Sequence, residues 1–270
     1  MMNNTPFTLL HQQNTPLLVC NVWDVASAKT AEKLAFSAIG TSSAAIARML
    51  GYADGEHMAF DELLYIVKRI AACCALPLSV DIEAGFSDDP QITAAYIKAL
   101  AEVGVVGINI EDSRVNKVNE QRTLLDENSF AGYLSALTTR LKKDNVSLFI
   151  NVRTDTFLLG VTGAESETKK RAKLYQTAGA DGLFVPCLVQ TEAIDAIVNS
   201  TTLPVNVMCM PELSDFASLR SLGIKRISMG NFLFDALQND LEEKLSIIQQ
   251  EKSFQVLFNI FNVHLNQLLK

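Results

Sequence analysis

The chain has 270 residues, 49% of them hydrophobic, so it can bury one sizeable core, and nothing in its composition suggests disorder. Its formal net charge is −7 and its basic residues are scattered, which argues against a nucleic-acid-binding surface. The first ten residues do not read as a secretory signal, and no segment approaches the roughly 20 apolar residues of a membrane span. We therefore expect a cytoplasmic protein with reduced cysteines and with neither nucleic acid nor membrane as a partner.

Short apolar runs alternate with segments of helical spacing along the chain. Residues 62–75 and 92–103 place apolar side chains three and four positions apart, as amphipathic helices do. The runs between such segments are nearly continuous in apolar residues, which is typical of a parallel sheet covered on both faces. Eight of these runs are predicted to be strands: 17–20, 38–41, 78–81, 107–110, 148–152, 182–185, 205–207 and 226–228.

The repeating strand–helix order favours a closed (β/α)₈ barrel over an open doubly wound sheet, because no glycine-rich dinucleotide fingerprint follows the first strand. We expect residues 1–270 to form a single barrel domain, with residues 231–270 as a C-terminal helical extension. This extension ends in an apolar stripe that packs either within the subunit or against a neighbouring one. The stripe consists of Phe254, Leu257, Phe258, Phe261, Leu265 and Leu268.

Acidic residues follow two neighbouring predicted strands, at the end of a barrel where active sites lie. Asp81 and Glu83 end the third strand, and an extended chain would point both carboxylates to one face. Glu111 and Asp112 end the fourth strand, so Glu111 can converge on the same point. Three close carboxylates repel unless a cation lies among them, and an all-oxygen cluster suits Mg²⁺ or Mn²⁺. The alternative is that these acids only cap helices or form ion pairs with nearby basic residues.

Polar residues at other strand ends could bind the substrate of such a site. Arg153 ends the fifth strand, and its guanidinium could bind a carboxylate by a two-point contact. An internal ion pair with Asp155 or Glu111 is equally consistent with the sequence. Ser42 and Ser43 follow the second strand and could donate hydrogen bonds to the same carboxylate. Asn206 either faces this mouth or makes hydrogen bonds within the barrel end.

Six short motifs at these strand ends resemble those of the isocitrate lyase and phosphoenolpyruvate mutase superfamily. They are Asn21-Val-Trp-Asp24 with Ser27-Ala28, Thr41-Ser-Ser-Ala44, Leu50-Gly-Tyr-Ala-Asp54, Val80-Asp-Ile-Glu-Ala-Gly-Phe86, Asn109-Ile-Glu-Asp-Ser113 and Asn151-Val-Arg-Thr-Asp155. The resemblance runs from about residue 7 to about residue 234. It implies a modified barrel whose last helix is exchanged between the subunits of a homodimer or a homotetramer.

The resemblance also implies a set of site residues. Asp81 would bind Mg²⁺ directly. Three further acids would hold the ion largely through water molecules: Asp54, Glu83 and Glu111. Four residues would bind the carboxylate of an oxo-acid: Ser42, Ser43, Ala44 and Arg153.

The loop after the fourth strand separates the reactions known in this superfamily. Isocitrate and methylisocitrate lyases carry a Lys-Lys/Arg-Cys-Gly-His motif there, whereas this chain has Ser113-Arg-Val-Asn-Lys-Val-Asn-Glu-Gln121. The cysteine that supplies the proton in those lyases is therefore missing. Lys117-Val-Asn119 is similar to the Lys-x-Asn of phosphoenolpyruvate mutase and phosphonopyruvate hydrolase, although the preceding Lys-x-Phe-Pro is absent. Lys117 and Asn119 are candidate catalytic residues beside Arg153.

Three functions are compatible with these residues. We favour an Mg²⁺-dependent lyase that cleaves a carbon–carbon bond of a small 2-oxo- or 2-hydroxy-acid and leaves a metal-bound enolate. The second is phosphonate chemistry, as in a phosphoenolpyruvate or carboxyvinyl-carboxyphosphonate phosphorylmutase or a phosphonopyruvate hydrolase, with Lys117 and Asn119 stabilising the transferred group. The third is a non-catalytic barrel that binds an oxo-acid, which the complete set of acids makes the least favoured.

Overall fold

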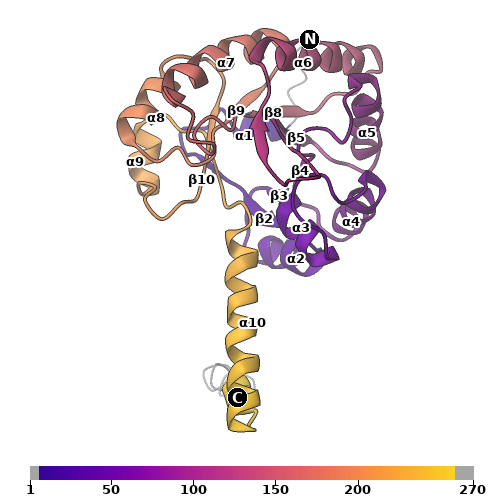
Figure 1. Cartoon of the computed structure of the whole chain (residues 1–270), viewed down its shortest axis with the longest axis vertical. Coiled ribbons are helices and arrows are strands. Elements are labelled where there is room, and N and C mark those ends of the chain that lie inside the picture. Colours follow the sequence, from indigo (N-terminus) through magenta and orange to yellow (C-terminus); the bar gives the residue numbers. More distant parts are fainter. Residues whose placement is uncertain (1–5, 259–270) are drawn as a thin grey trace. The chain divides into compact units, whose positions relative to one another are not determined.

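The computed structural model describes residues 6–258 of the chain (Figure 1). The chain divides into two compact units, Met1–Gly230 and Asn231–Lys270. The first unit contains all the strands found in the described residues, and the second is helical where it is described. The predicted strand and helix pattern can therefore be compared within the first unit.

Within residues 6–258, nine parallel strands form one sheet in the order β1-β11-β10-β9-β8-β5-β4-β3-β2. The two edge strands, β1 (Leu17–Leu18) and β2 (Cys20–Val22), are parts of one segment divided at Val19, so the sheet closes on itself as a (β/α)₈ barrel. The remaining strands are β3 (Ile39–Thr41), β4 (Leu78–Asp81), β5 (Gly107–Glu111), β8 (Phe149–Arg153), β9 (Gly182–Phe184), β10 (Val205–Met208) and β11 (Arg226–Ser228). The predicted barrel and its eight strand positions are confirmed.

Helices surround these strands on the outside (Figure 1). The helix predicted at 62–75 is α4, in which Leu63, Val67 and Ile70 are buried at spacings of three and four. The helix predicted at 92–103 is α5, which begins at Pro90 after the capping residue Asp89. The helices of the barrel are α2 (Val25–Lys33), α3 (Ser43–Leu50), α4 (Phe60–Cys73), α5 (Pro90–Glu102), α6 (Glu127–Lys143), α7 (Ala164–Ala178), α8 (Thr191–Val198) and α9 (Phe216–Ser221).

A short helix, α1 (Pro6–Leu10), closes the barrel at the N-terminal ends of its strands. The Phe7 ring meets the Phe149 ring edge to face, with 5.8 Å between the ring centroids. Phe7, Phe149, Leu17, Val19 and Ala38 form one buried cluster. This apolar plug leaves the opposite end of the barrel, where the strands finish, for polar side chains.

The second unit contains α10 (Phe232–Glu251) and α11 (Gln255–Phe258). Four leucines spaced by four residues along α10 are exposed: Leu233, Leu237, Leu241 and Leu245. Of the stripe predicted further on, Phe254, Leu257 and Phe258 are exposed, whereas Phe261, Leu265 and Leu268 lie outside the described residues. In the part of the chain that the structure describes, no helix is long and apolar enough to cross a membrane.

Candidate active site

Three of the predicted site residues end neighbouring strands of the barrel. Asp81 is the last residue of β4, Glu111 the last of β5 and Arg153 the last of β8. Glu111 and Arg153 are direct partners in the parallel register of β5 and β8. The register of a parallel sheet thus brings these side chains to one rim.

Glu83 lies at the same rim, but its backbone conformation is not the extended one that was predicted. The strand stops at Asp81, and the backbone at Glu83 has a φ of 51°, so the chain is not extended there. The Glu83 side chain is nevertheless buried, and the carboxylates of Asp54, Glu111 and Asp81 lie close enough to influence its pKa. A left-handed turn, rather than the alternation of a strand, therefore places Glu83 among the acids.

Burial raises the pKa values of Glu83 and Glu111. The pKa of Glu83 lies well above its ordinary value, first because of burial and then because of the neighbouring carboxylates. The pKa of Glu111 is raised to about 8, again mainly by burial, and the charges of Arg153 and Arg122 oppose this shift. Glu83 Oε2 accepts a hydrogen bond of 2.7 Å from the Glu56 backbone N–H, whereas its buried Oε1 has no hydrogen-bond partner among the described residues.

The Arg153 guanidinium forms the internal ion pairs that the sequence left open as an alternative. Its Nε and Nη2 atoms lie 2.6 and 3.0 Å from the two carboxylate oxygens of Asp155. Its Nη1 atom lies 2.8 Å from Glu111 Oε2, and its centre lies 5.9 Å above the Phe184 ring. These contacts fix the guanidinium beside the acids and raise its pKa.

The segment after β5 contains an antiparallel hairpin that the sequence analysis treated as a loop. Its strands are β6 (Ser113–Val115) and β7 (Arg122–Leu124). Arg122 brings a second guanidinium to the site, where it contacts Glu111 through Nη1 and lies 3.1 Å from Asp54 Oδ2 through Nη2. Sequence reasoning missed this residue, although it lies close to the segment that distinguishes the reactions of the superfamily.

The two catalytic candidates on this hairpin occupy different positions. Lys117 lines the cavity beside the acids, and its Nζ donates a hydrogen bond of 2.6 Å to the Glu56 carbonyl oxygen. Asn119 is exposed, and its Oδ1 accepts a hydrogen bond of 3.1 Å from the Gln121 backbone N–H within the turn. The structure therefore brings Lys117, but not Asn119, to the acids.

The start of α3 lies beside Asp81. Ser43 Oγ donates a hydrogen bond of 2.7 Å to Asp81 Oδ2, while Thr41 Oγ1 accepts one of 2.9 Å from the Asp81 backbone N–H. Ser42 caps the helix, and Ala44 lies in its first turn. Backbone N–H groups at a helix start favour a bound anion, so residues 42–44 are suitably placed for a substrate carboxylate.

Asn206 and Asp112 lie inside the protein rather than at the rim. Asn206 Nδ2 lies 3.1 Å from Ser228 Oγ, and Asn206 Oδ1 accepts a hydrogen bond of 3.1 Å from Asn151 Nδ2. Asp112 accepts hydrogen bonds from the Tyr175 hydroxyl at 2.7 Å and from Arg171 at 3.0 Å. Asn206 thus makes internal bonds, the alternative that the sequence left open, and Asp112 ties α7 to the barrel.

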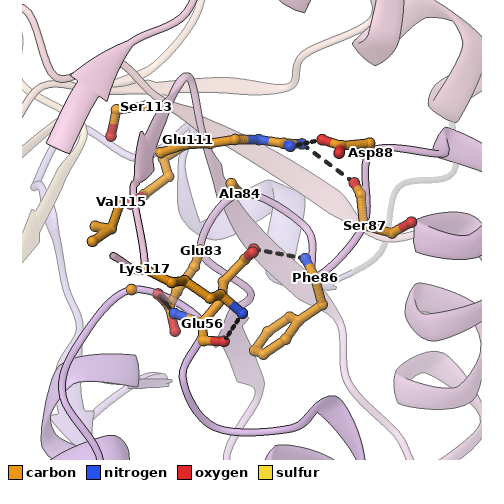
Figure 2. A pocket seen from close by; sticks show the side chains of 12 residues that line it. Glu56, Glu83, Ala84, Phe86, Ser87, Asp88, Glu111, Ser113, Val115 and Lys117 are labelled. Carbon is orange, nitrogen blue, oxygen red and sulfur yellow. Dashed lines mark hydrogen bonds and ion pairs between the residues drawn. The ribbon is translucent and has the colours of Figure 1, made fainter. Parts of the chain in front are cut away.

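A cavity of about 260 Å³ opens beside Glu83 and Glu111. Its walls are the 55–56 loop, the 83–88 loop and the hairpin, and Figure 2 shows its lining side chains. Arg114 pairs with Asp88 and Lys117 with Glu56, so the hairpin is attached to both loops. The volume suits a molecule of only a few carbon atoms.

The four acids do not form a ready-made ion site. Among the described residues, no three histidine, cysteine, aspartate or glutamate side chains are grouped closely enough to hold a metal ion. Arg122 and Arg153 instead contact the carboxylate of Glu111 on both its oxygens. The all-oxygen donor set and the unpartnered Glu83 oxygen fit a hard cation, and the predicted ligand set stays a prediction.

Known proteins are similar to this chain in sequence and in fold. Residues 7–249 match the phosphoenolpyruvate phosphomutase family. An uncharacterised protein of Mycobacterium tuberculosis is 34% identical over 84% of this chain and 82% of its own length. An oxaloacetate decarboxylase of Bradyrhizobium sp. (strain ORS 278) is 28% identical over 78% of this chain and 73% of its own length.

Two solved structures show the same fold. A protein of Burkholderia cenocepacia J2315, provisionally named a phosphonomutase, superposes with a TM-score of 0.82 and 33% identity over 89% of this chain and 98% of that one. A phosphonopyruvate hydrolase solved with oxalate and Mg²⁺ superposes with a TM-score of 0.80 and 19% identity over 100% and 97% of the two chains. The resemblance in the strand-end motifs is confirmed, and the chain belongs to the phosphoenolpyruvate phosphomutase family.

Proposed function

We propose that the protein is an Mg²⁺-dependent lyase that cleaves a carbon–carbon bond of a small 2-oxo- or 2-hydroxy-acid. The observation that carries this proposal is the group of acids at the C-terminal rim of the barrel, in which Asp81 ends β4 and the buried Glu83 and Glu111 line a cavity of about 260 Å³. The unpartnered Glu83 oxygen supports a bound cation. The similarity to an oxaloacetate decarboxylase supports a small oxo-acid as the substrate.

The proposed roles follow from where each side chain lies. Asp81, with Asp54, Glu83 and Glu111, holds the ion, for which Mn²⁺ is an alternative. The ion, when bound, supplies a Lewis acid to the oxygen on which negative charge develops. Residues 42–44, at the start of α3, bind the substrate carboxylate through the Ser43 and Ala44 backbone N–H groups and the Ser42 hydroxyl. The Ser43 hydroxyl joins them when it releases Asp81 Oδ2.

Basic residues complete the proposed site. Arg153 is fixed by Asp155 and orients the oxo-acid from the side of β8. Lys117 lines the cavity, so its ammonium group is the one on the hairpin that is placed to donate a proton to the departing group. Asn119 does not line the cavity and is bonded within the turn, so its catalytic role requires a different position of the turn.

The second candidate function is phosphonate chemistry. Lys117 and Arg114 line the same cavity, and two cations beside a hard metal ion suit a phosphonate group. The similarity to a protein provisionally named a phosphonomutase also favours it. Turnover of oxaloacetate, compared with turnover of phosphonopyruvate and carboxyvinyl-carboxyphosphonate, separates the two proposals.

The proposed assembly is a cytoplasmic homodimer or homotetramer in which the C-terminal segment is exchanged between subunits. The exposed leucines of α10 support it, because a contiguous apolar stripe is normally covered by another surface. Residues 231–270 are accordingly proposed to be an extension of a single barrel domain.

Calorimetric titration of the chelator-treated protein with oxalate, with and without Mg²⁺, tests the metal site. We expect oxalate to bind only when Mg²⁺ is present, and Asp81→Ala to lose this binding while its circular dichroism stays that of the wild type. Asp61→Ala removes an exposed acid of α4 and is the matched control. Oxalate binding that is independent of Mg²⁺, or that survives in Asp81→Ala, would contradict the proposal.

A further inference from the structure

Arg122 contacts two of the four acids that are proposed to hold the metal ion. Its Nη1 atom contacts Glu111 Oε1, and its Nη2 atom lies 3.1 Å from Asp54 Oδ2. The Arg122 side chain is 14% exposed and that of Glu111 is 4% exposed, so this contact is largely shielded from water. The charge of Glu111 is accordingly compensated by a side chain of the protein itself.

A guanidinium and a divalent cation place conflicting demands on the same carboxylates. Both are held by the lone pairs of the carboxylate oxygens, and the two positive charges repel each other strongly at short range. We propose that Arg122 competes with the divalent cation for Glu111 and Asp54, and so lowers the affinity of the site for its ion. This inference rests on the proposed metal-dependent function.

Two neighbouring oxygen atoms can accept hydrogen bonds from Arg122 when it releases these acids. Asp155 Oδ2 lies 3.4 Å and Ser113 Oγ lies 3.0 Å from the same Nη1 atom. A small shift of the guanidinium can therefore replace Glu111 by Asp155 without leaving the charge unpaired. Arg153 is different, because both oxygens of Asp155 already hold it in a two-point contact.

The test is the Mn²⁺ affinity of the chelator-treated protein, measured by calorimetry in the wild type and in Arg122→Gln. Removing one positive charge in contact with the ligands is expected to lower the dissociation constant about tenfold. Arg140→Gln is the matched control, because Arg140 lies on α6 outside the cavity and pairs with Asp144. Its dissociation constant is expected to stay within about twofold of the wild type.

Thermal unfolding gives a second readout that does not depend on activity. Without metal, Arg122→Gln is expected to have a lower Tm than the wild type, because Glu111 keeps only Arg153 as an internal cation and Asp54 loses its contact with Arg122. Saturating Mn²⁺ is expected to raise the Tm of Arg122→Gln by more than it raises that of the wild type. If Arg122→Gln does not fold, Arg122→Met tests the same point, since it also removes the positive charge and keeps a long unbranched side chain.

The outcomes distinguish this inference from the proposed function. Unchanged or weaker Mn²⁺ binding in Arg122→Gln would overturn the inference alone, because the arginine would then support the ligands rather than compete for them. A wild-type protein that binds no Mn²⁺ would overturn both. Tighter binding in Arg122→Gln with an unchanged Arg140→Gln supports the competition.

Discussion

Asp155 is the residue through which both arginines of the candidate site are held. It is fully buried, forms the two-point contact with Arg153 and also lies near Arg122. Its own backbone N–H donates a hydrogen bond of 3.0 Å to Asp112, which Arg171 and Tyr175 hold from α7. Asp112 thus acts indirectly: it fixes Asp155, and Asp155 in turn positions the guanidinium groups of the two arginines.

The pKa of His11 predicts how stability depends on pH at the other end of the barrel. Burial, with the charge of Arg226 second, lowers this pKa from 6.5 to about 3. Between pH 6.5 and 3 the unfolded chain binds a proton that the folded chain does not, so stability falls as the pH falls. From pH 7 to pH 5 this residue is expected to remove about 2 kcal/mol from the free energy of unfolding.

Urea unfolding of the wild type and of His11→Gln, at pH 7 and at pH 5, measures this contribution. The variant is expected to be less stable at pH 7, because the His11 ring stacks on Phe149 with 4.0 Å between centroids. The difference between the two proteins should shrink at pH 5, since only the wild type pays for keeping the imidazole neutral. An equal difference at both pH values would mean that His11 is not the group that titrates.

Residues were predictable from the sequence where a regular element fixes their position. Asp81, Glu111 and Arg153 end consecutive barrel strands, and parallel register brings such residues to one rim. Glu83 was expected there for the wrong geometric reason, because its left-handed backbone depends on the loop and not on the strand. Arg122 could not be placed, since its position depends on a hairpin register that two short polar strands do not specify.

At the scale of elements, the position of the hairpin depends on a close contact with the loop that precedes α4. A Cβ atom added at Gly55, where φ is +106°, would lie 2.6 Å from Val115 Cβ. Gly55→Ala is therefore expected to displace β6 from the 55–56 loop and to cost about 1–3 kcal/mol of stability. Because both elements line the cavity, Mg²⁺-dependent oxalate binding is expected to weaken by about tenfold or more.

Gly51→Ala is the control for the backbone strain in that experiment. Gly51 also has a positive φ, of +86°, but an added Cβ atom would have no neighbour within 4 Å. This variant should lose only about 1 kcal/mol and should bind oxalate as the wild type does. Equal losses of binding in both variants would show that strain, rather than the contact with Val115, is responsible.

The barrel strands could be predicted from the sequence, whereas the hairpin strands could not. Strands such as β5 and β8 are rich in apolar residues and almost entirely buried, so their hydrophobicity locates them in the sequence. The hairpin strands have only three residues each, and their side chains are mostly partly exposed. Their pairing depends on contacts with distant loops, including those of Arg114 and Lys117, which a local pattern does not contain.

At the scale of the whole molecule, the two ends of the barrel have separate tasks. The N-terminal end is closed by the apolar cluster around Phe7, where substitutions should change stability. The C-terminal end carries acids whose raised pKa values record an unfavourable burial of charge. The apolar cluster at the N-terminal end therefore offsets part of the electrostatic cost of burying acids at the C-terminal end.

The assembly of the molecule gives the last prediction. Leu237 and Leu241 are each 50% exposed and lie one turn apart on α10, so they present a continuous apolar edge. If a second subunit covers this edge, Leu241→Glu buries a charge in the interface, and the dissociation constant of the oligomer should rise at least about tenfold. Sedimentation equilibrium of the wild type and the variant measures this change.

Glu243→Gln, on an exposed position of the same helix roughly opposite Leu241, is the control and should keep the wild-type mass. A wild type that sediments as a monomer, or a Leu241→Glu variant that keeps the oligomeric mass, would show that α10 does not form the subunit contact.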